Sequence, residues 1–381
     1  MFARRETRQA LIWITLTITV LLLAAALLTV SGLYSVAASR GHFPWTSWLL
    51  KVGMHRSVAT HSLLVGSPPR LSDDNLVRLG AGHFHGGCVP CHGGPGKRSN
   101  PIVYHMLPPP PELSRVVQDW SDKELFWIVR NGIKYTGMPA WVALKRDDEV
   151  WAVVAFLRAL PKLGAQDYRK LTRSQDRVGN RRAEERARVG SGSQAISACA
   201  RCHGSETSPP ISSLVPIIAG QPAAYLESAL RQYADGDRES GIMQPVAAEL
   251  DADAISLLSK YYAGLSPALA GETIATPEQI TRGQAIATLG VPETGIPACL
   301  ACHAGSSPTF PLLAGQHARY TVNQLLVWQQ GLRATSAPGA IMAPIAKRLS
   351  RQQIDDVAAF FESLGAPRTA GDATTRVGQR P

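Results

Sequence analysis

Histidine follows a pair of cysteines at three places in the 381-residue chain. All six cysteines belong to C-x-x-C pairs, and a histidine comes directly after each pair. The three sets are Cys88, Cys91 and His92; Cys199, Cys202 and His203; and Cys299, Cys302 and His303. Since 10 of the 381 residues are histidines, a histidine follows a given C-x-x-C pair by chance about one time in forty. Three pairs that are each followed by histidine therefore point to a shared chemical role.

That role follows from the spacing of the three side chains. Two thiols can add to the two vinyl groups of a haem, and the next residue can then ligate its iron, so C-x-x-C-H is typical of c-type haem attachment. The sequence predicts three covalently bound haems, with His92, His203 and His303 as proximal ligands. A structural zinc site would need two more thiol or imidazole ligands at each motif, and a thioredoxin-like site would need a βαβ context.

Three methionines are the expected distal ligands of these irons. Met138, Met243 and Met342 follow their histidines by 46, 40 and 39 residues, and each has a proline one or two residues later. A lone methionine usually fills a core, but three at corresponding places favour ligation, which raises the haem potential and leaves no open iron position. Met106 is the alternative in the first unit. No side chain is needed for acid-base or nucleophilic work, so an electron carrier is expected rather than an enzyme.

The N-terminal region predicts a membrane anchor. Residues 9–39 carry no charge, and the most apolar part, Ala10 to Val30, is 21 residues long, enough as a helix for about 30 Å of bilayer. Arginines at positions 4, 5 and 8 precede it, which predicts a cytoplasmic N-terminus in a bacterial inner membrane and C-terminal domains in the periplasm. The alternative is a cleaved signal peptide, with Val36-Ala37-Ala38 as its processing site.

The elements around the motifs are expected to be helices, because strand signals are scarce. An apolar face over Asp147 to Leu160 predicts the last helix of the first unit. In the third unit, Thr276 and Ser350 each begin a helix with a capping-box pattern completed three residues later by glutamine. The fold class is therefore all-α, with one transmembrane helix followed by three small domains.

The second and third units form an internal repeat that sets the domain boundaries. Ala219-Gly220-Gln221 with Tyr225 corresponds to Ala314-Gly315-Gln316 with Tyr320, and the attachment histidines lie 100 residues apart. The expected segments are a cytoplasmic tip and anchor (1–40), a juxtamembrane segment (41–69), a first haem domain (70–162), a basic linker (163–188), a second haem domain (189–266), a third haem domain (267–366) and a disordered tail (367–381).

The net charge of +10 allows an anionic membrane surface or an acidic protein partner. Nucleic acid is disfavoured, because the sequence has no zinc-finger, RNA-binding or helix-turn-helix signature. Many of the basic residues gather in the linker, which as a flexible chain would reach about 30 Å and let the last two domains sweep a larger volume than the first.

Residues 70–162 resemble a single-haem class I cytochrome c, and about 190–366 resemble the dihaem cytochrome c-four family. The resemblance rests on the C-x-x-C-H motifs, on Gly137-Met138-Pro139 and on the Gly-Gln-x-x-x-Tyr and Met-x-Pro elements of the repeat. It implies compact helical domains that pass electrons between redox proteins, such as a quinol-oxidising complex or a dehydrogenase and a terminal oxidase. A dedicated subunit of a dehydrogenase or oxidase is the alternative, and a haem peroxidase would need an iron with an open face.

Overall fold

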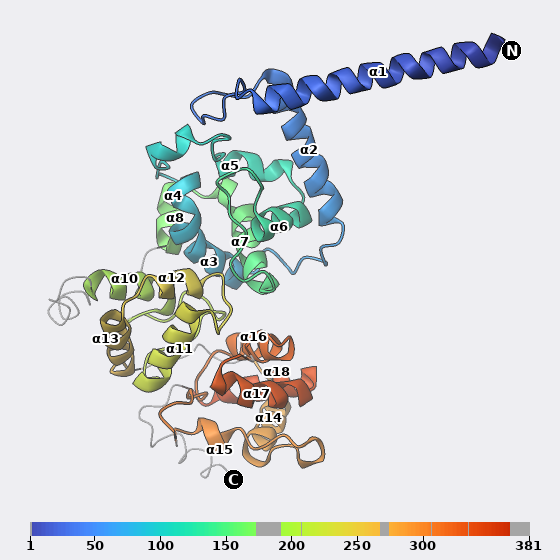
Figure 1. Ribbon diagram of the computed structural model, residues 1–381. Coiled ribbons are helices and arrows are strands. Elements are labelled where there is room, and N and C mark those ends of the chain that lie inside the picture. Colours follow the sequence, from blue (N-terminus) through green and yellow to red (C-terminus); the bar gives the residue numbers. More distant parts are fainter. Residues whose placement is uncertain are drawn as a thin grey trace. The chain divides into compact units, whose positions relative to one another are not determined.

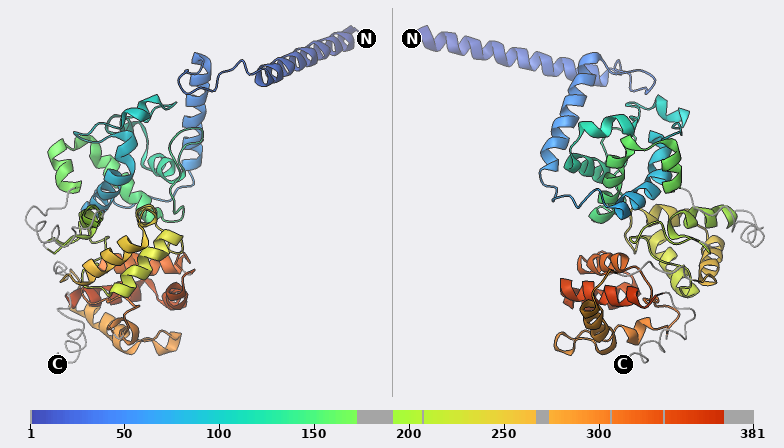
Figure 2. Two further views of the ribbon diagram at one scale, coloured as in Figure 1. Left: turned by 60° about the vertical axis from the view of Figure 1, so that its left-hand side comes forward. Right: turned by 180° about the vertical axis from the view of Figure 1, so that it is seen from behind.

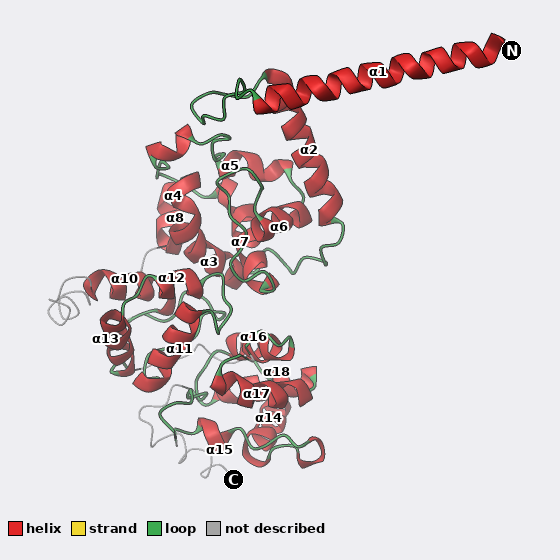
Figure 3. Ribbon diagram, viewed as in Figure 1, coloured by secondary structure: helices red, strands yellow, loops and turns green. Residues whose placement is uncertain are grey.

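The computed structural model describes residues 2–172, 192–206, 208–266, 274–305, 307–333 and 335–365. Every named element in these ranges is helical, and two isolated β-bridges are the remaining regular pairing (Figure 3). The prediction of an all-α fold is confirmed. Linker positions 173–188 and the tail at 367–381 lie outside the described residues.

The chain divides into two compact units. The first comprises residues 1–55 and 101–109, and the second comprises 56–100 and 110–381. In the first unit α1 (Phe2–Val30) is one uninterrupted helix in every view (Figure 2). Its part from Thr7 to Val30 is long and apolar enough to cross a membrane and has no buried residues, features that an N-terminal signal sequence shares. The helix α2 (Pro44–Ser62) follows it and continues into the second unit.

The first haem domain, called domain 1, is built on two crossing helices, α3 (Asp74–His83) and α7 (Asp147–Ala159). A Cβ at Gly80 would lie 2.0 Å from the carbonyl oxygen of Ala152, so only glycine permits this crossing. The apolar face predicted for Asp147 to Leu160 is confirmed by α7, where Val150 and Val154 are completely buried. The other elements of domain 1 are η1 (Phe84–Cys88), α4 (Val89–His92), α5 (Leu113–Val116), η3 (Val117–Asp119), α6 (Asp122–Asn131) and η4 (Leu160–Lys162). The short helix η2 (Pro101–His105) belongs to the first compact unit.

The beginning of the expected linker is part of domain 1. Residues Ala165–Thr172 form α8, in which Tyr168 is 2% exposed and packs with Phe84 and Phe156. The basic linker was expected to start at residue 163, but the apolar Tyr168 and Leu171 between the first basic residues pack into the core of domain 1.

The second and third haem domains, called domains 2 and 3, repeat one helical plan (Figure 1). Domain 2 contains α10 (Gly192–His203), α11 (Ala223–Asp235), α12 (Met243–Ala248) and α13 (Ala252–Ala263). Domain 3 contains α14 (Pro277–Leu289), η5 (Pro292–Thr294), α15 (Leu300–His303), α16 (Ala318–Gln329), α17 (Ala337–Arg348) and α18 (Arg351–Ser363). A Cβ at Gly283 in α14 would lie 2.0 Å from the carbonyl oxygen of Asp356 in α18, the same distance as that between a Cβ at Gly80 and the Ala152 carbonyl oxygen.

The two predicted capping boxes of domain 3 differ in outcome. At Ser350 both halves are present, since Gln353 also accepts from the Ser350 amide at 2.8 Å. At Thr276 the hydroxyl accepts from the Gln279 amide, but the Gln279 side chain bonds the Asp355 carbonyl instead. The second box is therefore half formed, because packing of α14 on α18 offers its glutamine another acceptor.

Polar contacts join the three domains within the second unit. Ser212 of domain 2 donates to the Asn75 carbonyl of domain 1 at 2.9 Å. Arg319 of domain 3 forms an ion pair with Asp73 at 2.7 Å. Domains 2 and 3 are therefore docked on domain 1, in contrast to the expectation that they sweep freely beyond the linker.

Candidate haem sites

Each attachment motif lies at the end of a short helical segment. Cys88 ends the π-helical turn η1, and α4 then carries Cys91 and His92. In domain 2 all three residues belong to the last turns of α10, whereas in domain 3 Cys299 is the N-cap residue of α15. Because each histidine is the last residue of its helix, the two cysteines precede it on one continuous turn.

Each of the three motif histidines forms a hydrogen bond with the backbone carbonyl oxygen of a proline. Nδ1 of His92 lies 2.9 Å from the Pro111 carbonyl oxygen, Nδ1 of His203 lies 3.2 Å from that of Pro216, and Nδ1 of His303 lies 2.9 Å from that of Pro311. A carbonyl oxygen can only accept, so Nδ1 carries the proton in each ring. Nε2 is then left with a lone pair, which is the arrangement of a histidine that ligates a metal.

Burial favours the neutral form of these rings. It lowers the pKa of His92, His203 and His303 below the ordinary value, and the hydrogen bond to the proline carbonyl opposes this only in part. A neutral imidazole is the form that binds iron. All three histidines therefore have the hydrogen bond and the neutral ring that ligation of a metal requires.

The thiols do not resemble a metal-thiolate centre. Burial raises the pKa of Cys88 to about 12 and those of Cys199 and Cys299 to about 11, so these side chains are neutral thiols, the form that adds to a vinyl group. Within the described ranges, no three His, Cys, Asp or Glu side chains converge closely enough to hold a metal ion. This geometry fits two separate thioether bonds and one axial ligand better than a structural zinc site.

The methionines expected as distal ligands lie in short, well-anchored segments. The amide of Met138 donates to Thr136 Oγ1 at 3.1 Å, and the amide of Met243 donates to Ser240 Oγ at 3.0 Å. Met342, in α17, packs against the apolar core of domain 3. All three side chains are half-buried. Met106, the alternative in the first unit, follows η2 and groups with the N-terminal unit.

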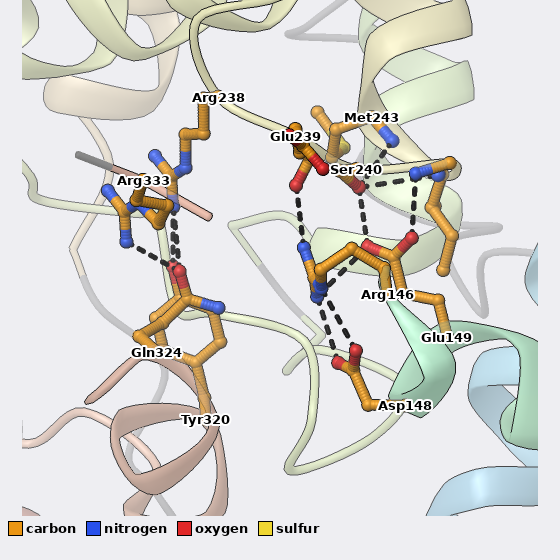
Figure 4. Close-up of polar contacts among 12 residues, drawn as sticks. Arg146, Asp148, Glu149, Arg238, Glu239, Ser240, Met243, Tyr320, Gln324 and Arg333 are labelled. Atoms are coloured by element: carbon orange, nitrogen blue, oxygen red, sulfur yellow. Dashed lines mark hydrogen bonds and ion pairs between the residues drawn. The ribbon is translucent and has the colours of Figure 1, made fainter. Parts of the chain in front are cut away.

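Two buried arginines face each other at the contact of domains 2 and 3. Arg238 is 4% exposed and donates to Tyr320 Oη at 3.1 Å and to Gln324 Oε1 at 3.2 Å. Arg333 is 9% exposed and donates to the same Gln324 oxygen at 2.6 Å (Figure 4). Burial, and then the charge of Arg238, lower the pKa of Arg333 to about 10.

These arginines fit a cofactor that brings its own carboxylates. Neither forms a salt bridge with any residue that the structure describes, and Nε of Arg238 is buried without an acceptor. A buried cation normally pairs with an anion, because desolvating an unpaired charge is costly. Haem propionates would supply that anion, and the domains that contain Arg238 and Arg333 are those that carry His203 and His303.

Comparisons with known proteins agree with this reading. The family Cytochrome C oxidase, cbb3-type, subunit III matches residues 75–157, within domain 1. The thiosulfate dehydrogenase electron acceptor of Stutzerimonas stutzeri is 34% identical over 192 residues, which are 47% of this chain and 85% of that protein. Cytochrome c4 of Thiocapsa roseopersicina is 37% identical over 175 residues, which are 44% of this chain and 86% of the relative. The chain belongs to the cytochrome c4 family.

The relatives are electron carriers, and this cytochrome is likewise a carrier of electrons on c-type haem rather than an enzyme. Among solved structures, cytochrome c4 of Acidithiobacillus ferrooxidans is 36% identical, with a TM-score of 0.40, over 44% of this chain and 98% of that one. The thiosulfate dehydrogenase of Marichromatium purpuratum is 31% identical, with a TM-score of 0.42, over 49% of this chain and 40% of the other. The predicted resemblance to the cytochrome c4 family is confirmed by the two sequence relatives.

Several residues that bind the motif histidines or lie at the contact of domains 2 and 3 are not apparent from motifs in the sequence. The proline carbonyls that hold the histidines lie 19, 13 and 8 residues beyond them, so no fixed spacing reveals them. The arginine pair did leave a signal, because Arg238 follows Gln221 by 17 residues and Arg333 follows Gln316 by the same distance. The two arginines therefore occupy equivalent positions of the repeat.

Proposed function

We propose that the chain is a membrane-anchored cytochrome with three c-type haems that relays electrons in a periplasmic respiratory chain. The observation that carries this proposal is the repeated histidine geometry, in which a proline carbonyl holds Nδ1 at each of the three C-x-x-C-H motifs. Each haem supplies one centre that is reduced and oxidised by one electron. The chain's own residues attach it, orient its axial imidazole and surround it with apolar side chains.

Met138, Met243 and Met342 are the proposed distal ligands. With both axial positions filled, the iron has no site for an exogenous substrate, which suits electron transfer and not peroxidase chemistry. Arg238 and Arg333 would hold propionates of the haems at His203 and His303, because they are buried cations without a carboxylate partner among the described side chains. Three such centres in docked domains form a relay.

The proposed partners are redox proteins on both sides of the relay. A quinol-oxidising complex or a dehydrogenase would supply electrons, and a terminal oxidase would remove them. A second candidate is a dedicated electron acceptor of one periplasmic dehydrogenase. The Stutzerimonas relative is an electron acceptor of thiosulfate dehydrogenase, which favours this candidate. The helix Thr7–Val30 would hold the chain at the outer face of the inner membrane.

The composition of the mature protein tests the cofactor and the anchor separately. Detergent-solubilised membranes should yield a chain with three haems by pyridine haemochrome, retained after acid-acetone extraction, and an intact mass that includes α1. Two or fewer haems would contradict the relay. A mass showing cleavage near Ala38 would contradict the anchor and leave the relay standing.

Electron exchange tests the partners. The reduced protein should be oxidised by membranes containing a terminal oxidase, and the oxidised protein should be reduced by membranes supplied with quinol. Rapid reduction by thiosulfate dehydrogenase and thiosulfate, without reduction by quinol, would support the dedicated acceptor and overturn the general carrier.

A further inference from the structure

Glu149 is a buried carboxylate at the contact of domains 1 and 2. It lies in the first turn of α7 in domain 1 and is 4% exposed, although most glutamates lie in water. Burial raises its pKa, and the nearby Arg146 opposes that effect. Figure 4 shows its carboxylate facing the segment that precedes Met243 in domain 2.

Four donors converge on this carboxylate. One oxygen, Oε1, accepts from Ser240 Oγ at 2.6 Å and lies 3.0 Å from Arg146 Nη2. The other, Oε2, accepts from the Gly241 amide at 2.7 Å and from Trp141 Nε1 at 3.3 Å. Both oxygens are therefore saturated, and two of the four donors come from another domain.

Three of the four donors of Glu149 belong to the segments that bear two proposed distal ligands. Trp141 follows Met138 by three residues, within the same loop of domain 1. Ser240 precedes Met243 by three residues, and its hydroxyl, while donating to Glu149, accepts from the Met243 amide at 3.0 Å. A chain of two hydrogen bonds thus leads from Glu149 to the backbone of Met243.

The close packing between these segments fixes their relative positions. A Cβ at Gly241 would lie 2.0 Å from Trp141 Nε1, so the glycine lies directly against the indole. Arg146 adds a bond from Nη1 to the Glu239 carbonyl at 2.8 Å, next to Ser240. The segment Glu239 to Gly241 is therefore held from domain 1 at three consecutive residues.

We propose that Glu149 is a positioning residue that holds the Met243 segment from domain 1 and so couples the distal sides of the haems at His92 and His203. The proposal rests on the proposed ligation by Met138 and Met243. It assigns to domain 1 a part in setting the axial ligation of the neighbouring haem. Replacing the Glu149 carboxylate should weaken the bond of Met243 to its iron, while the haem at His303 should stay unchanged.

The variant Glu149→Gln tests this in the holoprotein. An amide cannot accept four hydrogen bonds, because its NH₂ group must point at one of the two donor pairs. Losing a hydrogen bond to a charged group should favour detachment of Met243 by about tenfold to a hundredfold. The readouts are carbon monoxide binding to one reduced haem, a lower midpoint potential at that haem, and loss of its methionine-iron charge-transfer band.

Asp148→Asn is the matched control. Asp148 binds the same Arg146, with oxygens 2.9 Å from Nε and Nη2, but has no bond to either methionine segment. It should leave carbon monoxide binding and the potential at the level of the wild type. If Asp148→Asn acts as strongly as Glu149→Gln, the effect arises from Arg146 and the proposal is overturned.

Two further variants, Ser240→Ala and Met243→Ala, distinguish a positioning role of Glu149 from the ligand assignment itself. Ser240→Ala removes the link from Glu149 to the Met243 amide and keeps the other three donors, so it should shift the same haem in the same direction. Met243→Ala provides the signature of full detachment. If Met243→Ala alone changes the haem, the positioning role is overturned and the ligand assignment stands. If even Met243→Ala has no effect, the ligand assignment in the proposed function is wrong.

Discussion

Gln221 and Gln316 occupy equivalent positions in the two sequence repeats, and each binds the backbone of the other repeat. Gln221 donates to the Leu312 carbonyl at 2.8 Å and accepts from the Leu312 amide at 2.9 Å. Gln316 donates to the Ile217 carbonyl at 3.0 Å and accepts from the Ile217 amide at 2.9 Å. The paired elements of the sequence thus become a reciprocal contact between domains 2 and 3.

The first prediction concerns this contact. Gln316→Ala leaves the buried amide and carbonyl of Ile217 without partners, which should lower the free energy of unfolding by about 2 kcal/mol or more. Urea titration followed by haem absorbance measures the loss. Gln284→Ala, at an exposed position of α14, is the control and should change stability by less than about 0.5 kcal/mol. Equal effects of the two substitutions would contradict the interface role.

The second prediction concerns the distal ligand in domain 3. Met342→Ala should open one iron, lower the potential of that haem and allow one carbon monoxide to bind per chain, since a thioether ligand raises the potential. Met106→Ala is the matched control and should leave all three haems closed. Carbon monoxide binding to the reduced wild type at one haem per chain would refute the assignment of three methionine ligands.

The third prediction concerns acid stability. Burial, and then the charge of Arg201, lower the pKa of His83 to about 4, and its ring lies 4.6 Å from that of Trp141. The unfolded chain takes up the proton near pH 6.5, so stability is full above that pH and falls as the pH drops toward 4. The shift corresponds to about 3 kcal/mol.

His83→Phe keeps an aromatic ring against Trp141 but cannot be protonated. Urea unfolding between pH 4 and 6.5 should therefore show a smaller slope of stability with pH than in the wild type. His105→Gln, at an exposed position, is the control. Parallel slopes in wild type and His83→Phe would show that His83 does not cause the acid sensitivity.

The fourth prediction concerns the buried arginines. Arg333→Gln removes a positive charge from the contact of domains 2 and 3, which should stabilise the oxidised haems and lower their potentials. The expected decrease in haem potential is on the order of 50 mV, which is equivalent to ~1 kcal/mol of lost charge interaction. Spectroelectrochemistry measures the change, and Arg351→Gln, an exposed ion-pair residue of α18, is the control. Unchanged potentials in Arg333→Gln would mean that no propionate depends on it.

The sequence alone determined the features that depend on a few adjacent residues. The C-x-x-C-H motif fixes two thiols and an imidazole within five residues, so covalent haem and a proximal histidine follow directly from it. The Ser350 capping box and the apolar face of α7 were equally local, and the structure confirms both. The repeat of the Ala-Gly-Gln element indicated two related domains.

Only the tertiary structure decided how these local units are joined. Glu149 lies in the first turn of α7, yet it binds Ser240, which lies 91 residues away. Gln221 binds Leu312, which is also 91 residues away in the sequence. Tyr168 packs into domain 1 from a stretch that was expected to be a basic linker. Helical periodicity describes which face of a segment is apolar over three or four residues. It carries no information on which distant backbone will meet a buried polar side chain, because that depends on how whole helices pack.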